Sequence, residues 1–460
     1  MRFSALLVFA PLFAQAVLIV PGATWKDTSG NTIQAHGAGF LKVNSTYYWF
    51  GEDKAANSAL FSAVSCYTSP DLGTWTRQNN ALTPIANTMI SSSNIVERPK
   101  GSFNSEYVMW FHSDTSNYGA AQVGVATSKT PCGPYTYKGS FSPLGAESRD
   151  ESVFQDDDAA QTAYLLYASD NNQNFKISRM DANYYNLTAQ VNVLTASTLE
   201  APGMLKRNGQ YFLFASHTSG WAPNPNKYFV ASTLDLNPVA TYYSQNAFDL
   251  AVGTNALYAG DRWRSDILGS STYIWLPLSW ASGVPQLVWA DLWNLNIANG
   301  SYSVVTGGTT YEAEKGVRSG SSTLISDSSF RNGGSVAITV QGSGAQQWVS
   351  LYIANGDSTW RNSTVSVNGG ASVVVQQPNT GGGQIVLSVP LSLNLKSGSN
   401  TITFGAGQSN YAADLDKIIV YPPQPTAGTV PPGTTTTSSS TGGSTDWCVQ
   451  VCTLAMFYSY

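Results

Sequence analysis

A short signature, repeated five times between residues 50 and 261, constrains the possible fold more than any other feature of this sequence. Each copy holds an aromatic residue, two mostly small residues and a polar residue. The copies are Phe50-Gly-Glu-Asp53, Phe111-His-Ser-Asp114, Tyr167-Ala-Ser-Asp170, Phe214-Ala-Ser-His217 and Tyr258-Ala-Gly-Asp261. Successive aromatic residues lie 61, 56, 47 and 44 residues apart, which fits one four-stranded propeller blade rather than a helical repeat. The repeat predicts an all-β chain with a five-bladed β-propeller over residues 17–306.

The fourth copy shows how each signature relates to a hairpin. Two apolar runs, 204–205 and 211–214, are joined through Asn208-Gly209, a dipeptide that supplies the positive φ angles of a tight turn. The signature aromatic Phe214 ends the second run. We therefore expect every signature to close the second strand of a hairpin.

Polar residues stand at a nearly constant distance before the signature aromatics. They are His36, Glu97 and Glu200 at 14 residues, Gln245 at 13, and Asp150 with Glu151 slightly earlier in the third copy. Equivalent positions on the innermost strands of a propeller point at its central axis, so these side chains should converge on one pocket. A pocket that holds one protonated and one ionised carboxyl group is suited to cleaving a glycosidic bond.

Composition narrows the class of protein. Only 11% of the residues are charged and 12% are aromatic, as in β-rich extracellular proteins. The net charge of -5 provides no basic surface for nucleic acid. Residues 1–16 read as a secretory signal peptide that is too short to span a membrane, and no other apolar run is long enough to do so. We expect a secreted protein without a membrane segment.

The cysteines and the N-glycosylation sequons are consistent with secretion. Cys66 follows the first signature and Cys132 the second, and a disulfide between them is plausible in an oxidising compartment, although spacing alone does not establish pairing. Cys448 and Cys452 lie in the tail and lack the partners of a zinc site. Acceptor sequons for N-glycosylation begin at Asn44, Asn186, Asn299 and Asn362.

Three separated segments carry a resemblance to a known family. They are Leu199-Glu200-Ala201-Pro202-Gly203, the run from Arg149 to Asp158, and Gly260-Asp261-Arg262-Trp263-Arg264. These segments resemble glycoside hydrolase family 43, a family of five-bladed propellers, and more narrowly its fungal exo-β-1,3-galactanases. The resemblance extends over residues 20–306.

The resemblance implies roles for the pocket residues. Glu200 matches the general acid, and Asp150 matches the carboxylate that keeps the proton affinity of the acid high. Most members are inverting enzymes with an Asp base at the start of the first blade, where this chain has His36-Gly37-Ala38-Gly39, as in the exo-galactanase subgroup. We expect Gln245 to hold the attacking water through its amide oxygen. We expect Glu97 to bind sugar hydroxyls, with a weak base as its alternative role.

Further residues are candidates for the rim of the pocket. Tyr118, Asn172, Thr218 and Trp221 follow the second, third and fourth signatures closely, where loops should surround the pocket. The three histidines all fall at blade positions, and among them we assign His36 a sugar contact. A metal held by the histidines is the less favoured interpretation. No cofactor is expected for catalysis.

Residues 307–422 predict a second domain, a β-sandwich (jelly-roll) module that resembles a family 35 carbohydrate-binding module. By that resemblance Glu312, Glu314 and Asp416 hold a structural Ca²⁺, for which carboxylates are suitable ligands. Sugar contacts are assigned to Asp357, Trp360, Arg361 and Asn410. Residues 423–460 are a Ser/Thr/Pro-rich linker with an unassigned tail.

Together these features predict a secreted inverting exo-glycosidase that releases galactose from β-1,3-galactan of plant cell-wall arabinogalactan, acting as a monomer. Two alternatives stay open. One is another family 43 specificity, an arabinofuranosidase or xylosidase. The other is a catalytically impaired protein that only binds polysaccharide.

Overall fold

Nearly all the regular structure in this computed structural model is β-strand. The structure describes residues 16–222, 226–230, 233–239, 241–320, 323–324, 330–331, 334–383, 385–405 and 412–424. Within these ranges the helices are three short 3-10 turns, Pro143–Gly145, Leu268–Ser270 and Ala313–Lys315. The predicted all-β class is confirmed. Residues 1–15 of the predicted signal peptide 1–16 lie outside the described residues, as do Asn410 and most of the predicted linker and tail.

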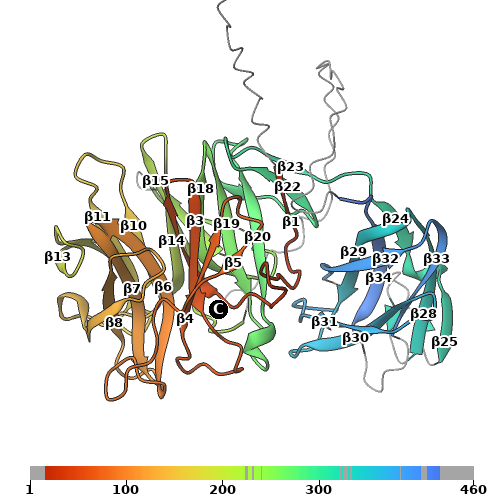
Figure 1. Ribbon diagram of the computed structural model, residues 1–460, viewed down its shortest axis with the longest axis horizontal. Helices are drawn as coiled ribbons and strands as arrows, with labels where there is room; N and C mark the ends of the chain where they lie inside the picture. Colours follow the sequence, from red (N-terminus) through yellow and green to blue (C-terminus); the bar gives the residue numbers. More distant parts are fainter. Residues whose placement is uncertain are drawn as a thin grey trace, which may run out of the picture. The chain divides into compact units, whose positions relative to one another are not determined.

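Twenty strands of the described chain form five successive four-stranded antiparallel sheets, each built from strands that are consecutive in the sequence (Figure 1). Sheet 1 contains β2 (His36–Val43), β3 (Thr46–Glu52), β4 (Val64–Ser69) and β5 (Thr76–Arg77). Sheet 2 contains β6 (Asn94–Asn104), β7 (Glu106–Thr115), β8 (Gln122–Ser128) and β9 (Thr136–Phe141). Sheet 3 contains β10 (Glu151–Gln155), β11 (Ala163–Ser169), β12 (Asn174–Met180) and β13 (Leu187–Leu194).

The last two of these sheets follow the same plan. Sheet 4 contains β14 (Leu199–Arg207), β15 (Gln210–His217), β16 (Asn226–Val230) and β17 (Thr233–Val239). Sheet 5 contains β18 (Gln245–Val252), β19 (Asn255–Arg262), β20 (Thr272–Ser279) and β21 (Gln286–Leu287). The first strands contact one another in a closed cycle, β2 with β6, β6 with β10, β10 with β14, β14 with β18 and β18 with β2. This cycle brings the starts of five strands together.

The signature aromatics form the core between these sheets. Phe50, Phe111, Tyr167, Phe214 and Tyr258 lie on the second strands and are at most 1% exposed. Second strands such as β7 and β19 are buried along most of their length, because neighbouring sheets cover both faces. The predicted hairpin turn is also confirmed, since Arg207 pairs with Gln210 and both Asn208 and Gly209 have positive φ. The repeat in the sequence thus reflects how the sheets pack.

Two further connections tie the sheets together. Cys66 in β4 and Cys132, in the loop between β8 and β9, form a disulfide that links sheet 1 to sheet 2. A three-stranded sheet joins the beginning of the described chain to a late segment, with β1 (Ala16–Ile19) paired to β22 (Trp293–Asn296) and β22 to β23 (Tyr302–Val304).

The remaining described strands form two larger antiparallel sheets and a small hairpin. One sheet has the order β24 (Thr309–Glu312), β34 (Asp414–Val420), β29 (Ala345–Ala354), β32 (Leu387–Leu395). The other has the order β25 (Val317–Gly320), β28 (Gly334–Gly342), β33 (Gly398–Phe404), β30 (Arg361–Val367), β31 (Val373–Gln377). The hairpin pairs β26 (Thr323–Leu324) with β27 (Phe330–Arg331). Apolar side chains from both sheets, such as Ile338 and Leu351, meet in one buried core.

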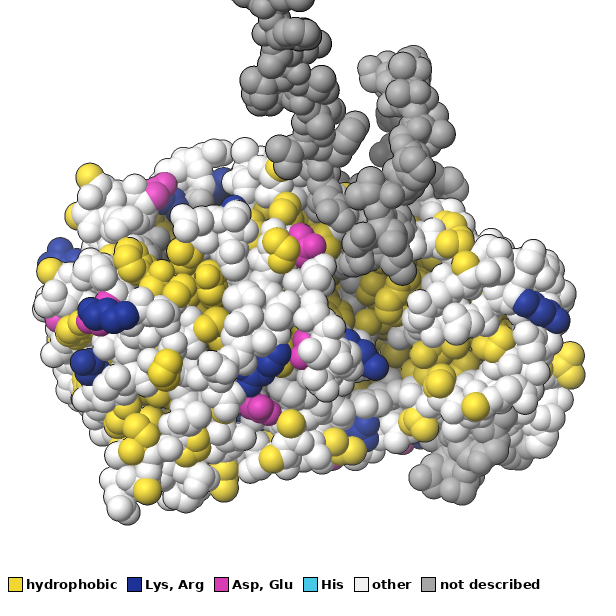
Figure 2. Space-filling view, viewed as in Figure 1, with side chains coloured by type: hydrophobic (Ala, Val, Ile, Leu, Met, Phe, Trp, Pro, Cys, Tyr) yellow, Lys and Arg dark blue, Asp and Glu magenta, His cyan; other side chains and the backbone are white. Residues whose placement is uncertain are grey.

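The surface carries few charges. On the face drawn in Figure 2, few acidic and basic side chains lie among neutral polar and hydrophobic ones, as the charged content of 11% leads one to expect. A helix of the length and apolarity that membrane crossing requires does not occur among the described residues.

Candidate active site

β-Bulges on the innermost strands set the directions of the pocket side chains. The strand pairing shifts between His36 and Gly39, Glu97 and Lys100, Glu200 and Gly203, and Asn246 and Phe248. Gly37, Arg98 and Ala201 have positive φ at three of these places. In a regular strand consecutive side chains point to opposite faces, whereas a bulge re-aims them. The bulge in β6 therefore allows Glu97 and Arg98 to line the same pocket.

The starts of the innermost strands surround a pocket of about 350 Å³. Eight of the nine side chains predicted for the propeller site line it: Glu97, Tyr118, Asp150, Asn172, Glu200, Thr218, Trp221 and Gln245. The sequence interpretation missed six lining residues: Glu52, Arg98, His112, Arg149, Gly220 and Trp263. The structure therefore brings the predicted carboxylates and amide together in one cavity.

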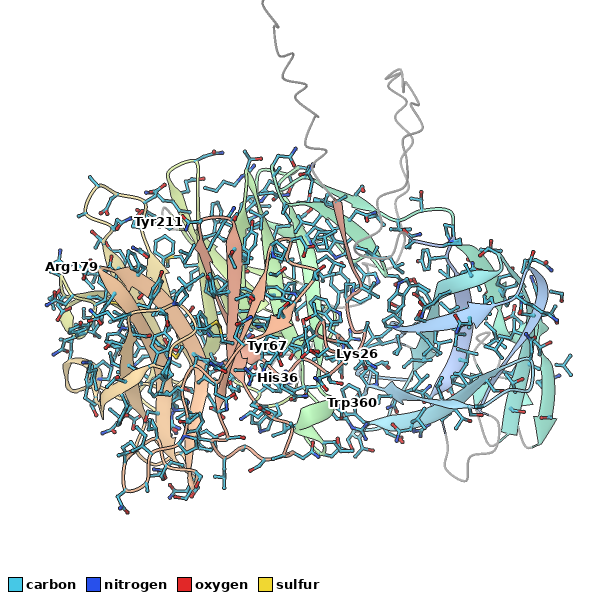
Figure 3. All side chains as sticks on the ribbon, in the orientation of Figure 1. Lys26, His36, Tyr67, Arg179, Tyr211 and Trp360 are labelled. Atoms are coloured by element: carbon cyan, nitrogen blue, oxygen red, sulfur yellow. A yellow bond between two sulfur atoms is a disulfide. The ribbon has the colours of Figure 1, made fainter. Side chains whose placement is uncertain are left out.

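His36 is the exception, and its predicted sugar contact is corrected here. It lies at the start of β2, completely buried among the inner strands (Figure 3). Its Nδ1 is 2.9 Å from Asp261 Oδ1, and its ring packs against Trp263 and Tyr273. The side chain fills space between sheets 1 and 5, so it supports the wall of the pocket without reaching a sugar.

Glu200 has the environment of a protonated carboxyl group. It is 6% exposed, and its Oε1 accepts hydrogen bonds from the Ser219 backbone N (3.0 Å) and from Gln245 Nε2 (3.0 Å). Burial, together with the negative charge of Asp150, raises the pKa of Glu200 to about 7. A carboxyl group with this pKa can donate a proton near neutral pH.

Asp150 lies directly beside the strand that carries Glu200. Its Oδ2 accepts a hydrogen bond from the Ala201 backbone N (3.0 Å) and forms an ion pair with Arg98 Nε (2.9 Å). The bond to Ala201 holds the Asp150 carboxylate next to β14, where its charge acts on Glu200. This position matches the role that the resemblance assigns to Asp150.

The amide of Gln245 is oriented by its neighbours. Its Oε1 accepts from Arg98 Nη2 (2.7 Å) and from Trp263 Nε1 (2.8 Å), while its Nε2 donates to Glu200 Oε1. Two donors already occupy the two lone pairs of the amide oxygen. The expectation that this oxygen holds the attacking water is therefore contradicted by the geometry, because the end of the amide that faces Glu200 is the nitrogen.

Glu97 is held as a carboxylate by a chain of hydrogen bonds. Its Oε2 is 3.2 Å from His112 Nδ1, and Tyr118 donates its hydroxyl proton to Oε1 at 2.7 Å. His112 Nε2 faces Asp114 Oδ2 at 3.0 Å. Burial alone would lower the pKa of His112, but the two carboxylates outweigh it and raise that pKa to about 10. Burial likewise opposes ionisation of Glu97, yet the bonds from His112 and Tyr118 lower its pKa.

The rest of the lining offers sugar-binding surfaces. The rings of Trp221 and Trp263 meet edge to face with centroids 4.6 Å apart, and Lys54 lies over Trp221. The Oδ1 atom of Asn172 is buried without a hydrogen-bond partner in the described structure. A pocket that combines aromatic faces with unmet hydrogen-bonding capacity is suited to a sugar ring.

Comparison with known proteins gives the family. The model of glycosyl hydrolases family 43 matches residues 35–249. A crystal structure of an exo-β-1,3-galactanase of Phanerochaete chrysosporium matches this chain with 67% sequence identity and a TM-score of 0.85. The match covers 88% of this chain and 100% of the Phanerochaete chain. The chain belongs to glycosyl hydrolase family 43. It is therefore a glycoside hydrolase, and membership implies a β-propeller.

Further structures and relatives are similar to this chain. The Phanerochaete enzyme has been solved with β-1,3-galactotriose and with galactose. An exo-β-1,3-galactanase of Clostridium thermocellum is 28% identical, covering 86% of this chain and 99% of that chain, with a TM-score of 0.59. A β-D-galactofuranosidase of Aspergillus niger is 27% identical over 250 residues, which are 48% of this chain and 69% of the relative.

Glu52 lies beside Gly37, in the segment where the family resemblance led us to expect an Asp base. A Cβ atom on Gly37 would lie 2.3 Å from Glu52 Oε1, so the absence of a side chain there admits the Glu52 carboxylate from β3. Its Oε1 accepts from the Arg98 backbone N, and its Oε2 pairs with Lys54 Nζ at 2.8 Å. Glu52 belongs to the first signature, so the repeat itself could have identified it.

Two groups of side chains contain the residue types that bind metal ions. Glu97, His112 and Asp150 offer ligand atoms within 4.8 Å of one another, but carboxylates face both His112 nitrogens and Arg98 pairs with Asp150. This is a hydrogen-bonded cluster and not a set of free ligands. In the second region, Glu312 and Asp416 lie on the paired strands β24 and β34, and the buried Glu314 Oε2 has no hydrogen-bond partner among the described residues. Among the described residues, these three carboxylates do not form a group whose ligand atoms all lie within 4.8 Å of one another, so the Ca²⁺ site stays a prediction.

The predicted sugar contacts of the second region lie at and just before β30. Arg361 donates to Asp357 Oδ2 through Nε at 2.7 Å and to the Ala412 carbonyl through Nη1 at 2.8 Å. The Arg264 guanidinium lies over the Trp360 ring at 5.5 Å from its centroid. Asp357 is therefore engaged by a neighbouring cation, and Trp360 stacks against one.

Proposed function

We propose that this protein is an exo-β-1,3-galactanase that releases galactose from β-1,3-galactan, with its five four-stranded sheets as the blades of the propeller. One observation carries the proposal. The pocket joins a buried Glu200 of raised pKa to Asp150 in a chain that is 67% identical to a galactanase solved with β-1,3-galactotriose. The family and the pocket together support the same chemistry.

In the proposed reaction Glu200 donates its proton to the glycosidic oxygen as the bond from that oxygen to C1 of the terminal galactose breaks. A water attacks C1 from the opposite face and loses its proton to one of the pocket carboxylates, which inverts the anomeric centre. Glu97, held ionised by His112 and Tyr118, binds sugar hydroxyls. Gln245 positions Glu200 through its amide nitrogen.

The second region is proposed to be a β-sandwich module that binds carbohydrate and holds a structural Ca²⁺. Its two sheets share one core, and the orphan Glu314 oxygen, with Glu312 and Asp416, is an oxygen donor set of the kind that Ca²⁺ prefers. The proposed sugar site of this module consists of Asp357, Trp360, Arg361 and Asn410, the last of which lies outside the described residues. The protein is proposed to be secreted and monomeric, acting on plant cell-wall polysaccharide.

The test is release of galactose from linear β-1,3-galactan, with the anomer of the first product followed by NMR. Wild-type protein should release inverted galactose, and Glu200→Gln should lower kcat by at least about 100-fold while keeping its affinity for β-1,3-galactobiose. Aryl arabinofuranosides, xylosides and galactofuranosides are the comparison substrates. Faster turnover of any of these would replace the galactanase assignment, and binding without release from every substrate would make the protein a polysaccharide binder.

A further inference from the structure

Arg98 contacts more of the proposed catalytic machinery than any role assigned so far explains. Its guanidinium reaches Asp150 Oδ2 through Nε, Gln245 Oε1 through Nη2 and the Asn246 carbonyl through Nη1, at 2.9, 2.7 and 3.0 Å. It is 5% exposed and lines the pocket. One planar group thus joins the loop before sheet 3 to the first strand of sheet 5.

The backbone at Arg98 supports a positioning role. Its φ of 52° lies in the left-handed region, which disfavours residues with a side chain. Its N–H donates to Glu52 Oε1, and its carbonyl accepts from Lys100 Nζ at 3.1 Å. Strained backbone of this kind persists where surrounding contacts enforce it and is concentrated at functional sites.

The neighbours of Gln245 decide which end of its amide faces Glu200. An arginine guanidinium and a tryptophan indole can only donate hydrogen bonds, so the amide atom against Arg98 and Trp263 must be oxygen. The NH₂ group consequently points at Glu200 Oε1. The bond from Arg98 is charge-assisted and is the stronger of the two restraints.

This orientation protects the proton of Glu200. Oε1 already accepts from Gln245 Nε2 and from the Ser219 backbone N, so the proton resides on Oε2. With the amide reversed, its oxygen would face Glu200 and accept that proton in a hydrogen bond. The proton would then be held by the amide and would not be available to the glycosidic oxygen.

We infer that Arg98, assisted by Trp263, is a positioning residue that keeps the Gln245 amide nitrogen toward Glu200 and so keeps the acid proton available to the leaving group. The inference rests on the proposed function, because it concerns the proton that Glu200 transfers. It adds Arg98, a residue from the second sheet, to a site otherwise described by Glu200, Asp150, Gln245 and Glu97.

The first experiment compares Arg98→Met and Arg98→Lys with wild type on β-1,3-galactobiose. Arg98→Met should lower kcat by about 100-fold with KM changed less than about threefold, since misplaced catalytic groups cost this much. Lysine keeps the charge but has no planar fork, so Arg98→Lys should recover only part of the loss. The charge of Arg98 lowers the pKa of Glu200, so the alkaline limb of the pH profile should move upward in Arg98→Met and less in Arg98→Lys.

A chemical rescue and a matched control separate positioning from folding. Guanidinium ion at millimolar concentration should raise kcat of an Arg98→Ala variant several-fold and leave wild type unchanged. Arg179→Met, at an exposed residue in β12, the third strand of sheet 3, should behave like wild type (Figure 3). Trp263→Phe, which leaves the Arg98 bond in place, should lose less activity than Arg98→Met. Should Arg98→Met fail to fold, kcat, KM and the alkaline limb of Arg98→Lys are compared with those of wild type instead.

Unchanged kcat together with an unmoved alkaline limb in Arg98→Lys and Arg98→Met would overturn the inference and leave the proposed function standing. Wild-type protein that releases no galactose would instead overturn the proposed function. In that case the pH dependence of β-1,3-galactobiose affinity reports Glu200 without turnover, with Glu200→Gln as the variant that removes it. An upward shift of this dependence in Arg98→Met would support the positioning role, and no shift would overturn it.

Discussion

Glu200 concentrates the chemistry of the molecule in one carboxyl group. It lies in a bulge, close to the charged Asp150 and largely out of water, and both conditions favour its neutral form. Its hydrogen-bond donors come from neighbouring strands, because Ser219 follows β15 and Gln245 begins β18. At this scale the site is a set of hydrogen bonds whose donors and acceptors determine where a proton resides.

The pH dependence of activity follows from that environment. The active form of Glu200 is the protonated one, and its pKa is raised to about 7. Raising the pH through 7 removes the proton, so kcat/KM should fall about tenfold per pH unit on the alkaline side. The measurement is kcat/KM against pH on β-1,3-galactobiose, with Glu200→Gln lacking that limb. A profile that stays flat from pH 6 to 9 would contradict the assignment of Glu200 as the acid.

At the scale of elements, the close approach of β2 to β6 shapes the pocket. Gly39 lies in the bulge of β2, directly against the bulge of β6. An added Cβ atom would lie 2.2 Å from the Pro99 carbonyl oxygen, which is backbone and cannot rotate away. The absence of a side chain at residue 39 therefore allows two bulged strands to meet.

Gly39→Ala should consequently push β6 away and disturb Arg98, which precedes Pro99. Overpacking of this kind destabilises a protein by roughly 1–3 kcal/mol. We expect a lower Tm by calorimetry and a lower kcat. Gly383→Ala is the control, because nothing lies within 4 Å of a Cβ atom there. Equal Tm and kcat for Gly39→Ala and wild type would show that β2 and β6 tolerate a wider spacing.

At the scale of the whole molecule, the cycle of sheets is stabilised by connections between segments far apart in the sequence. The β1–β22 pairing joins residues near 16 to residues near 296, and the disulfide joins two cysteines separated by 66 residues. The disulfide, being covalent, persists in the unfolded chain and restricts it more strongly the longer the loop it closes. The cycle is thereby held by a covalent bond in addition to the packing of its aromatic core.

Removing the disulfide with Cys66→Ala and Cys132→Ala together should destabilise the protein by about 4 kcal/mol, from the loop that the bridge closes. Denaturant unfolding of the double variant measures this. As a control, wild-type protein treated with a reductant should show most of the same loss in the free energy of unfolding. Stability within about 1 kcal/mol of oxidised wild type would mean that packing alone maintains the contact of sheets 1 and 2.

Much of this architecture was predictable because it depends on local pattern. Phe50, Phe111 and the other signature aromatics repeat since each blade buries one second strand, and Asn208-Gly209 specifies its turn through its own φ preference. The offset of 14 residues placed Glu97 and Glu200 correctly because hairpins of similar length bring equivalent residues to equivalent places. It misjudged His36, because the side chain pairs with Asp261 and packs against Trp263 and Tyr273 in the wall between sheets 1 and 5.

The amino-acid sequence by itself determined an all-β chain with five repeated hairpins, and it indicated which carboxylates begin the innermost strands. These features follow from residue spacing, turn preference and burial, which act along the chain. Only the tertiary structure decided that Glu52 fills the space beside Gly37, that Arg98 and Trp263 orient the Gln245 amide, and that Glu200 keeps its proton. These depend on contacts between different sheets, and hydrogen-bond direction and desolvation exist only once those sheets have packed.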